Sequence, residues 1–386
     1  MNQRLSDFLN AGRWIASLLV VLSHTRHLLF VDLKDVVNPS LAWKGFYFLT
    51  GFGDEAVVAF FVISGFLVGG LSSEKIMSGQ RHLSGYFVDR FSRIYVVLFP
   101  ALLVGGALDL IGANFLNTSE LYSNAPKYGS SALGWIVDTR LNLEHFLGSL
   151  FMLQNVFTLP FGSNGPLWSL SFEWWYYMAF AAVCGTTQST TTSRKLISAL
   201  SLSSMLFLLP GKIVLFGTLW LVGAGAYHWI RKGLPVPPFW LGIALLAATL
   251  TYARLGHNIN NLTDQESLSS AFSRSLLVAI GFGLATLSAS KGTHLPFSQL
   301  SKWLANFSYS TYLFHFPALV FLIAAGMEMG LPMLNNKPSA GALLLFTCLL
   351  FLTYTWCYAA SRLTEAHTER VRNMLRTFWL STKLAR

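Results

Sequence analysis

The sequence predicts an all-α membrane protein, a polytopic helical bundle of about ten transmembrane helices with both termini in the cytoplasm. Hydrophobic residues make up 53% of the 386 residues and charged residues only 11%. A soluble domain carries about 25% charged residues, because its surface faces water. The apolar residues also gather in runs close to the ~20 residues that cross a bilayer. These observations exclude a soluble enzyme and a disordered chain.

Ten apolar runs qualify as spans. The first, from about Trp14 to Phe30, is interpreted as a retained signal-anchor helix, because no small-residue cleavage site follows it. An eleventh run, 145–159, is short, which leaves open a full span, a re-entrant segment or an interfacial helix. The other nine runs lie near residues 54–71, 94–112, 168–185, 196–210, 212–230, 239–253, 272–289, 303–325 and 340–360.

The distribution of Lys and Arg decides between ten and eleven spans. The chain has 27 Lys and Arg against 17 Asp and Glu, a net charge of +10. With ten spans and a cytoplasmic N-terminus, about two thirds of these cations fall on the inner side, as the positive-inside rule requires. An eleventh span would move Arg194, Lys195 and the cations of the tail outside. The segment 145–159 is therefore predicted not to cross.

Residues 1–361 are predicted to form one integral-membrane domain. Within it, 113–166 is too long for a plain connector and is predicted to be an external cap that holds the 145–159 helix. Residues 362–386 form a basic cytoplasmic tail. The three cysteines are too few for a zinc site, so no metal is predicted.

Ionisable side chains inside apolar runs are costly and are the first candidates for function. His24 follows Arg13 by about three helical turns, so both lie on one face with Ser17 between them. Arg90 and Arg93 are spaced i, i+3 and project from one side of a helix, where two guanidinium groups suit a phosphate. The alternative is that the arginines only anchor the inner boundary and His24 bonds a neighbouring helix.

Two later segments combine polar and aromatic residues. Glu173 lies about one and a half turns into its predicted span, with Ser169 one turn above it on the same face and Trp168 beside it. The carboxylate needs a partner and is suited to orienting a histidine, whereas the aromatic residues are either an interfacial belt or stacking platforms for a sugar. His315 shares a face with Ser308 and Thr311, and the alternative for it is a satisfied histidine in a packing helix.

Taken in order, these segments resemble membrane acyltransferase family three, the integral-membrane O-acyltransferases of bacterial surface glycans. The resemblance extends from residue 13 to residue 317, and the blocks together are specific although each alone is weak. It departs at Val96 and Val97, where the family often has a proline, and at Ala56. The matching blocks are Arg13-x10-His24, Phe60-Phe-Val-Ile-Ser-Gly-Phe-Leu67, Arg90-x-x-Arg93-Ile-Tyr95, Leu167-Trp-Ser-Leu-Ser-Phe-Glu173 and Ser308-Tyr-Ser-Thr-Tyr-Leu-Phe-His-Phe-Pro317.

The resemblance implies transfer of an acyl group, usually acetyl, from cytoplasmic acyl-CoA to a hydroxyl of a surface polysaccharide or its lipid-linked precursor. It places the protein in the bacterial inner membrane, with acetyl-CoA as co-substrate, no bound cofactor and no nucleic-acid partner. In this reading Arg13, Arg90 and Arg93 bind the CoA phosphates. His24 acts as general base or carries the acyl group, and Glu173 fixes its tautomer.

The same resemblance gives the acceptor side to Trp168, Ser169 and His315. Two other classes remain open at this point. A transporter or flippase for an anionic or glycan substrate would line its pathway with the same residues. A membrane scaffold without activity would use them only for packing.

Overall fold

The protein is a helical bundle, described by a computed structural model over residues 2–116, 120–130, 132–189, 191–260 and 267–384. These residues form no β-strand, and eight helical segments are long and apolar enough to cross a membrane. The prediction of an all-α polytopic bundle is confirmed. The α-helices are α1 (Gln3–Leu29), α2 (Leu41–Leu49), α3 (Gly53–Ser64), α4 (Ser73–Met77), α5 (Leu83–Phe115), α6 (Leu143–Leu150), α7 (Trp168–Gln188), α8 (Thr192–Leu208), α9 (Gly211–Arg231), α10 (Phe239–Asn260), α11 (Leu268–Ser288), α12 (Ser298–Ala305), α13 (Ser308–Glu328), α14 (Ala340–Leu363) and α15 (Thr368–Leu384).

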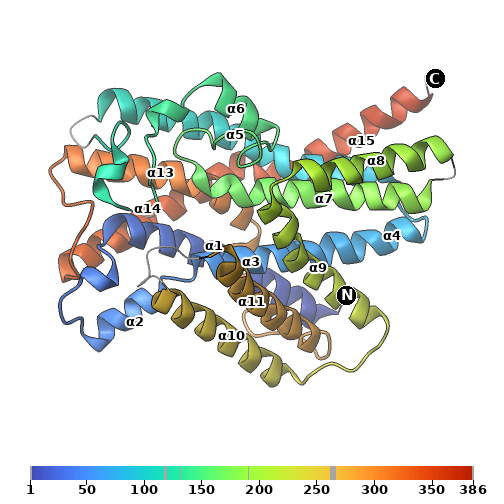
Figure 1. The fold of residues 1–386 in the computed structure, drawn as a ribbon, viewed down its shortest axis with the longest axis horizontal. Coiled ribbons are helices and arrows are strands. Elements are labelled where there is room, and N and C mark those ends of the chain that lie inside the picture. The colour runs from blue at the N-terminus through green and yellow to red at the C-terminus, as the bar shows by residue number, and fades with distance from the viewer. Residues whose placement is uncertain (1, 117–119, 131, 190, 261–266, 385–386) are drawn as a thin grey trace.

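Two of the ten predicted spans lie outside the set of eight. They form α7 and α8, which pack side by side as an antiparallel pair (Figure 1). With 17 residues, α8 is shorter than the ~20 residues that cross the hydrocarbon core. Crossing therefore stays a prediction for these two helices.

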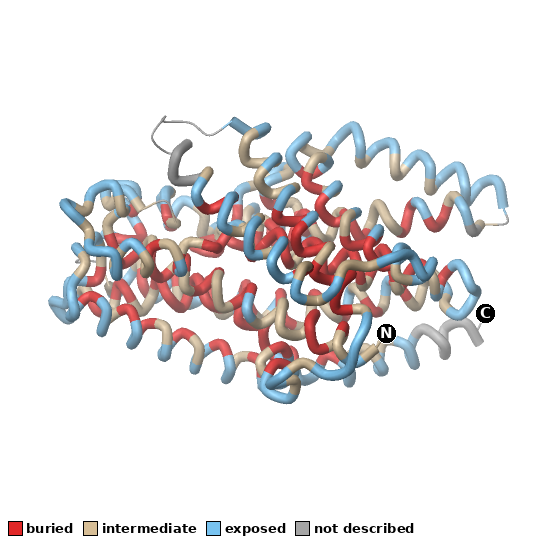
Figure 2. The backbone as a smooth tube through the Cα atoms, turned by 90° about the horizontal axis from the view of Figure 1, so that it is seen from below, coloured by how far each residue is buried: buried red, intermediate tan, exposed pale blue. Residues whose placement is uncertain are grey.

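The long helices α1, α5, α7 and α13 run along the long axis of the molecule, whereas α9, α10 and α11 cross it obliquely (Figure 1). The two ends of the chain lie toward the same end of the long axis in both views (Figures 1 and 2). On the predicted topology this end is the cytoplasmic side.

Buried residues gather along the centre of the bundle, and exposed residues cover its outside (Figure 2). Many of the exposed residues are large and apolar: Phe207 on α8 is 88% exposed and Phe351 on α14 is 70% exposed. A soluble monomer rarely leaves such surfaces open to water. These faces suit contact with lipid.

Two helices begin earlier than the apolar runs predict. Helix α1 starts at Gln3, capped by the Asn2 side chain, which accepts from the Leu5 amide at 3.0 Å. Arg13 thus lies ~15 Å along the helix and not at its start. Helix α5 starts at Leu83, so Arg90 and Arg93 sit inside it. Both early segments are too polar to register as apolar runs, although they are helical.

The segment 145–159 is helical only at its beginning. Asn142 caps α6 by accepting from the His145 amide at 3.0 Å. The helix ends at Leu150, and Met152 and Asn155 then adopt left-handed conformations with φ of 60° and 59°. At eight residues, α6 is shorter than expected and too short to span a bilayer.

Close packing of α9 on the α3 region depends on two glycines. After α3 the chain continues as a π-helical segment, η2 (Gly65–Ser72). A Cβ at Gly65 would collide with the Trp220 carbonyl of α9, and a Cβ at Gly223 would collide with the Val62 carbonyl of α3. The absence of a side chain at both positions lets the backbones meet.

Helix α1 is tied to its neighbours at both ends. At one end, the Asn336 amide donates to the Leu29 carbonyl at 2.8 Å and the Val31 amide donates to the Asn336 carbonyl at 3.1 Å. At the other end, the Leu295 amide donates to the Asp7 carboxylate at 3.2 Å. Segments that flank α12, α13 and α14 therefore fix the position of α1.

Candidate functional site

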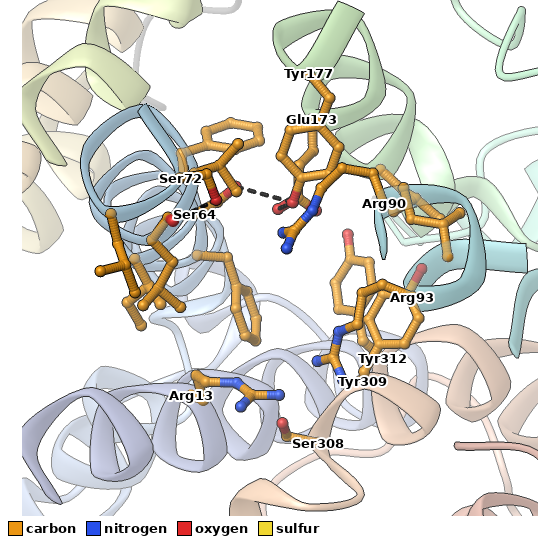
Figure 3. A pocket seen from close by; sticks show the side chains of 18 of the residues that line it. Arg13, Ser64, Ser72, Arg90, Arg93, Glu173, Tyr177, Ser308, Tyr309 and Tyr312 are labelled. Atoms are coloured by element: carbon orange, nitrogen blue, oxygen red, sulfur yellow. Dashed lines mark hydrogen bonds between the residues drawn. The ribbon is translucent and has the colours of Figure 1, made fainter. Parts of the chain in front are cut away.

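A cavity of about 360 Å³ lies between α1, α3, η2, α5, α7 and α13 (Figure 3). Glu173 is the one carboxylate among its described lining residues. The lining of the cavity is therefore rich in basic side chains, and we name it the arginine cavity. Its basic lining residues are Arg13, Lys75, Arg81, Arg90, Arg93 and Arg372.

Arg93 is held by a buried carboxylate. Its Nη1 lies 3.3 Å from Oε1 of Glu365, and its guanidinium carbon lies 5.0 Å from the centroid of the Tyr309 ring. The other oxygen of Glu365 accepts from the Ser310 amide at 2.9 Å. These contacts orient one forked donor group toward the cavity.

Arg13 and Arg90 carry charges that the protein does not neutralise by contact. Across the described residues, neither guanidinium forms an ion pair with a carboxylate. Arg90 lies 5.5 Å from the centroid of the Tyr177 ring, and its Nε is buried without a hydrogen-bond partner. Buried polar groups normally have partners, so such a group suits an anionic ligand.

Asp89, which is buried on α5, binds basic side chains that line the cavity. Its carboxylate pairs with Arg81 and with two arginines of α15: Arg376 at 2.7 Å and Arg372 at 3.7 Å. Burial lowers the pKa of Arg81, and the guanidinium groups of Arg90, Arg376 and Arg372 lower it further. More positive charge is therefore gathered here than one carboxylate balances.

A chain of hydrogen bonds holds Glu173. The Trp220 indole N–H donates to the Ser64 hydroxyl at 3.2 Å, and Ser64 lies 3.1 Å from the Tyr177 hydroxyl. The Tyr177 hydroxyl donates to the Glu173 carboxylate at 2.5 Å. Glu173 is thus a fixed group on the cavity wall and has a partner other than a histidine.

His24 and His315 form a pair. Nδ1 of His24 lies 2.8 Å from Nε2 of His315, and the two rings lie edge to edge in one plane, with centroids 5.1 Å apart and an angle of 2° between the planes. Nδ1 of His315 lies 3.0 Å from the Thr311 carbonyl and 2.9 Å from the Tyr312 carbonyl. A carbonyl only accepts, so this nitrogen carries the proton of neutral His315.

The tautomers of both rings follow. Because Nε2 of neutral His315 has no proton, it accepts from Nδ1–H of His24. Nε2 of His24 then keeps its lone pair. This is the state that a general base or a nucleophile needs.

The structure brings five of the predicted site residues to the arginine cavity: Arg13, Arg90, Arg93, Ser169 and Glu173. His24 and His315 pair with each other as described, and His24 belongs to neither that lining nor the lining of the second cavity described below. The expected orientation of His24 by Glu173 is wrong, because Glu173 bonds Tyr177. His315 is the eighth residue of α13.

Trp168 points elsewhere. It lines the second cavity, while its neighbour Ser169 lines the arginine cavity and contacts the Tyr312 hydroxyl. Sequence reasoning missed Lys75, Arg81 and Arg372 as site residues because all three fit the pattern of topogenic charges. Their position near other arginines could have been found only from tertiary packing.

Residues 6–362 match a family described as an acyltransferase domain. The chain belongs to membrane acyltransferase family three. It is an integral-membrane acyltransferase, and the matched range includes the arginine cavity and the histidine pair apart from Arg372. A search of curated proteins and of solved structures finds no match.

Proposed function

We propose that this acyltransferase moves an acetyl group from acetyl-CoA, bound in the arginine cavity, to a hydroxyl of a surface polysaccharide or its lipid-linked precursor at the bacterial inner membrane. The observation that carries the proposal is that six basic side chains line a single cavity, two of which, Arg13 and Arg90, form no ion pair with a carboxylate among the described residues. CoA presents a diphosphate and a further phosphate, and forked guanidinium groups bind such groups tightly.

The thioester end must travel from the cavity toward the histidine pair. Tyr312 supports such a route, because it lines the cavity and its ring centroid lies 6.1 Å from that of His315. His315 in turn contacts His24. The acyl chain would therefore pass Tyr312 to reach His24, and Ser169 lies beside this route.

In the proposed reaction, Nε2 of His24 takes the proton of the acceptor hydroxyl while the hydroxyl oxygen attacks the thioester carbonyl carbon. The C–O bond forms, the C–S bond breaks, and the departing CoA thiolate takes the proton from His24. The same nitrogen would carry the acetyl group in a two-step route. Glu173 acts as a positioning residue that holds Tyr177 beside Arg90.

The test uses the purified protein in proteoliposomes, with acetyl-CoA labelled in its acetyl group as donor and polysaccharide from the host as acceptor. Arg90→Gln should raise the KM for acetyl-CoA by about 10- to 100-fold, the value of a charge-assisted hydrogen bond. Arg194→Gln, on the exposed face of α8, is the matched control. His24→Ala should lower kcat by about 10²- to 10⁴-fold.

Two results would contradict the proposal. One is an unchanged KM for acetyl-CoA in Arg90→Gln. The other is label that crosses the membrane without appearing on the polysaccharide, which would favour the transporter class.

A further inference from the structure

A second cavity, of about 390 Å³, lies between α3, α9, α10, α11 and the start of α7. Its described lining contains two carboxylates and two basic side chains, so it is balanced in charge, unlike the arginine cavity. Three aromatic rings complete the wall. We name it the mixed-charge cavity, and these residues are Asp54, Glu55, Lys212, Arg274, Phe61, Trp168 and Phe216.

The two cavities use largely different ends of the helices. The mixed-charge cavity takes residues from the beginnings of α3, α7, α9 and α11 and from the second half of α10. The predicted topology places all five ends on the outer side. The arginine cavity shares the beginning of α7, through Ser169 and Glu173, but it also takes residues from η2, α4, the start of α13 and α15, which the same topology places on the inner side.

The cavities meet at a thin wall. Phe61 lines both of them. Trp168 and Ser169 are consecutive residues, but Trp168 lines the mixed-charge cavity and Ser169 lines the arginine cavity. The rings of Phe61 and Trp168 lie 6.3 Å apart between centroids. Phe61 and Trp168 would therefore separate a donor in one cavity from an acceptor in the other.

The chemistry of the mixed-charge cavity suits a neutral polyol. Carboxylates accept hydrogen bonds from hydroxyl groups, and ammonium and guanidinium groups donate to hydroxyl oxygens. Aromatic faces pack against the apolar C–H surface of a sugar ring. Nζ of Lys212 lies 5.4 Å from the centroid of Trp168 and 5.7 Å from that of Phe216, so all three groups converge on one place.

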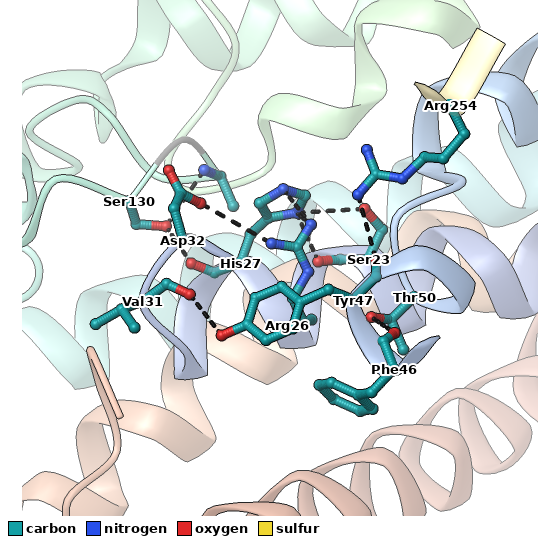
Figure 4. A network of polar contacts seen from close by, with 11 residues as sticks. Ser23, Arg26, His27, Val31, Asp32, Phe46, Tyr47, Thr50, Ser130 and Arg254 are labelled. Carbon is teal, nitrogen blue, oxygen red and sulfur yellow. Dashed lines mark hydrogen bonds and ion pairs between the residues drawn. The ribbon is translucent and has the colours of Figure 1, made fainter. Parts of the chain in front are cut away.

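The rim of the cavity is fixed by a buried polar network (Figure 4). Arg254 is 7% exposed and donates to the Tyr47 carbonyl at 3.2 Å, and its guanidinium packs against Gly51 of the rim. The Tyr47 hydroxyl donates to the Val31 carbonyl at 2.8 Å. Next to the rim, Gly53 packs on Ser23, the residue before His24. A rigid rim beside the proposed base favours a site that binds a substrate in one orientation.

We infer that the mixed-charge cavity is the acceptor site, and that it binds an uncharged, hydroxyl-rich sugar unit between the carboxylates of α3 and the ring of Trp168. This inference rests on the proposed acetyl transfer. It adds the place where the acceptor binds and the absence of net charge on the sugar.

The experiment measures steady-state transfer from labelled acetyl-CoA to 4-nitrophenyl glycosides of glucose, galactose, mannose, rhamnose and N-acetylglucosamine by the protein in proteoliposomes. Asp54→Asn should raise the KM for the best glycoside by about 10- to 100-fold, the value of a hydrogen bond to a charged group. Trp168→Phe should also raise this KM, by a smaller factor, because the smaller ring covers less of the sugar. The KM for acetyl-CoA should not change. The matched controls are Asp35→Asn, an exposed carboxylate of the 30–40 segment, and Trp240→Phe, which is 70% exposed.

The outcomes separate the two proposals. A wild-type protein that neither binds nor turns over acetyl-CoA rejects the proposed function itself. A wild-type protein that turns over acetyl-CoA while no glycoside accepts the label rejects the sugar assignment alone. The mixed-charge cavity is rejected as the acceptor site if Asp54→Asn and Trp168→Phe are active and leave the KM for the glycoside unchanged. It is also rejected if the controls Asp35→Asn and Trp240→Phe raise this KM as much. Detergent-stable, monodisperse variants are compared, so a failure to fold is not counted as a loss of binding.

Discussion

Replacement of His315 by Phe tests the hydrogen bond that fixes the tautomer of His24. The substitution keeps an aromatic ring in a fully buried position but removes the acceptor that lies 2.8 Å from Nδ1 of His24. A neutral hydrogen bond contributes about 0.5–1.5 kcal/mol, so kcat should fall about 2- to 13-fold. Loss of the base itself costs about 10²- to 10⁴-fold.

The assay is acetyl transfer at saturating acetyl-CoA, with the abundance of folded protein measured for each variant. His315→Gln supplies a carbonyl oxygen that can accept from His24, so it should recover part of the rate lost in His315→Phe. A purely structural role for His315 would make Gln at least as harmful as Phe, because Gln is polar in an apolar site. That order, or wild-type kcat in His315→Phe, would refute the tautomer argument.

Two other contacts give direct predictions. Gly223→Val should lower Tm and the yield of folded protein, because overpacking at the α9 contact costs about 1–3 kcal/mol. Gly225→Val, on the open side of the same helix, should have little effect, and equal losses in both variants would contradict the packing role. Asp89→Asn should release α15, since it removes the carboxylate that binds Arg376, and trypsin should then cut α15 faster than in Glu369→Gln. Equal cleavage rates would show that α15 is held by other contacts.

The sequence predicts the fold class well because the apolar runs report helices that face lipid. It predicts helix beginnings poorly where the first turns are polar. The segment 83–93 contains Asp89, Arg90 and Arg93, so no apolar run marks it, although it is helical and packs against α15. Helix α2 was missed for a different reason, since its nine residues are too few to form a span.

For the candidate site, too, the sequence predicts what depends on spacing within one helix and misses what depends on contacts between distant helices. Spacing within one helix correctly places Arg90 and Arg93 on one side, and both reach the same cavity. The bond between His24 and His315 joins residues 291 positions apart, so no local periodicity predicts it. The prediction that Glu173 contacts His24 assumed that two polar groups inside the bundle would bond each other. A tyrosine on the same helix satisfies the carboxylate instead.

The ties at both ends of α1 have a consequence for how the enzyme opens. The histidine pair bridges α1 and α13, and Asn336 joins the end of α1 to the segment that follows α13. Because these contacts join α1 to α13 and to the segment after it, we expect the two helices to move together, with the imidazole of His24 between them. We therefore expect the conformational change that admits or releases a bulky substrate to be a movement of α9, α10 and α11, which cross the bundle obliquely, relative to α1 and α13.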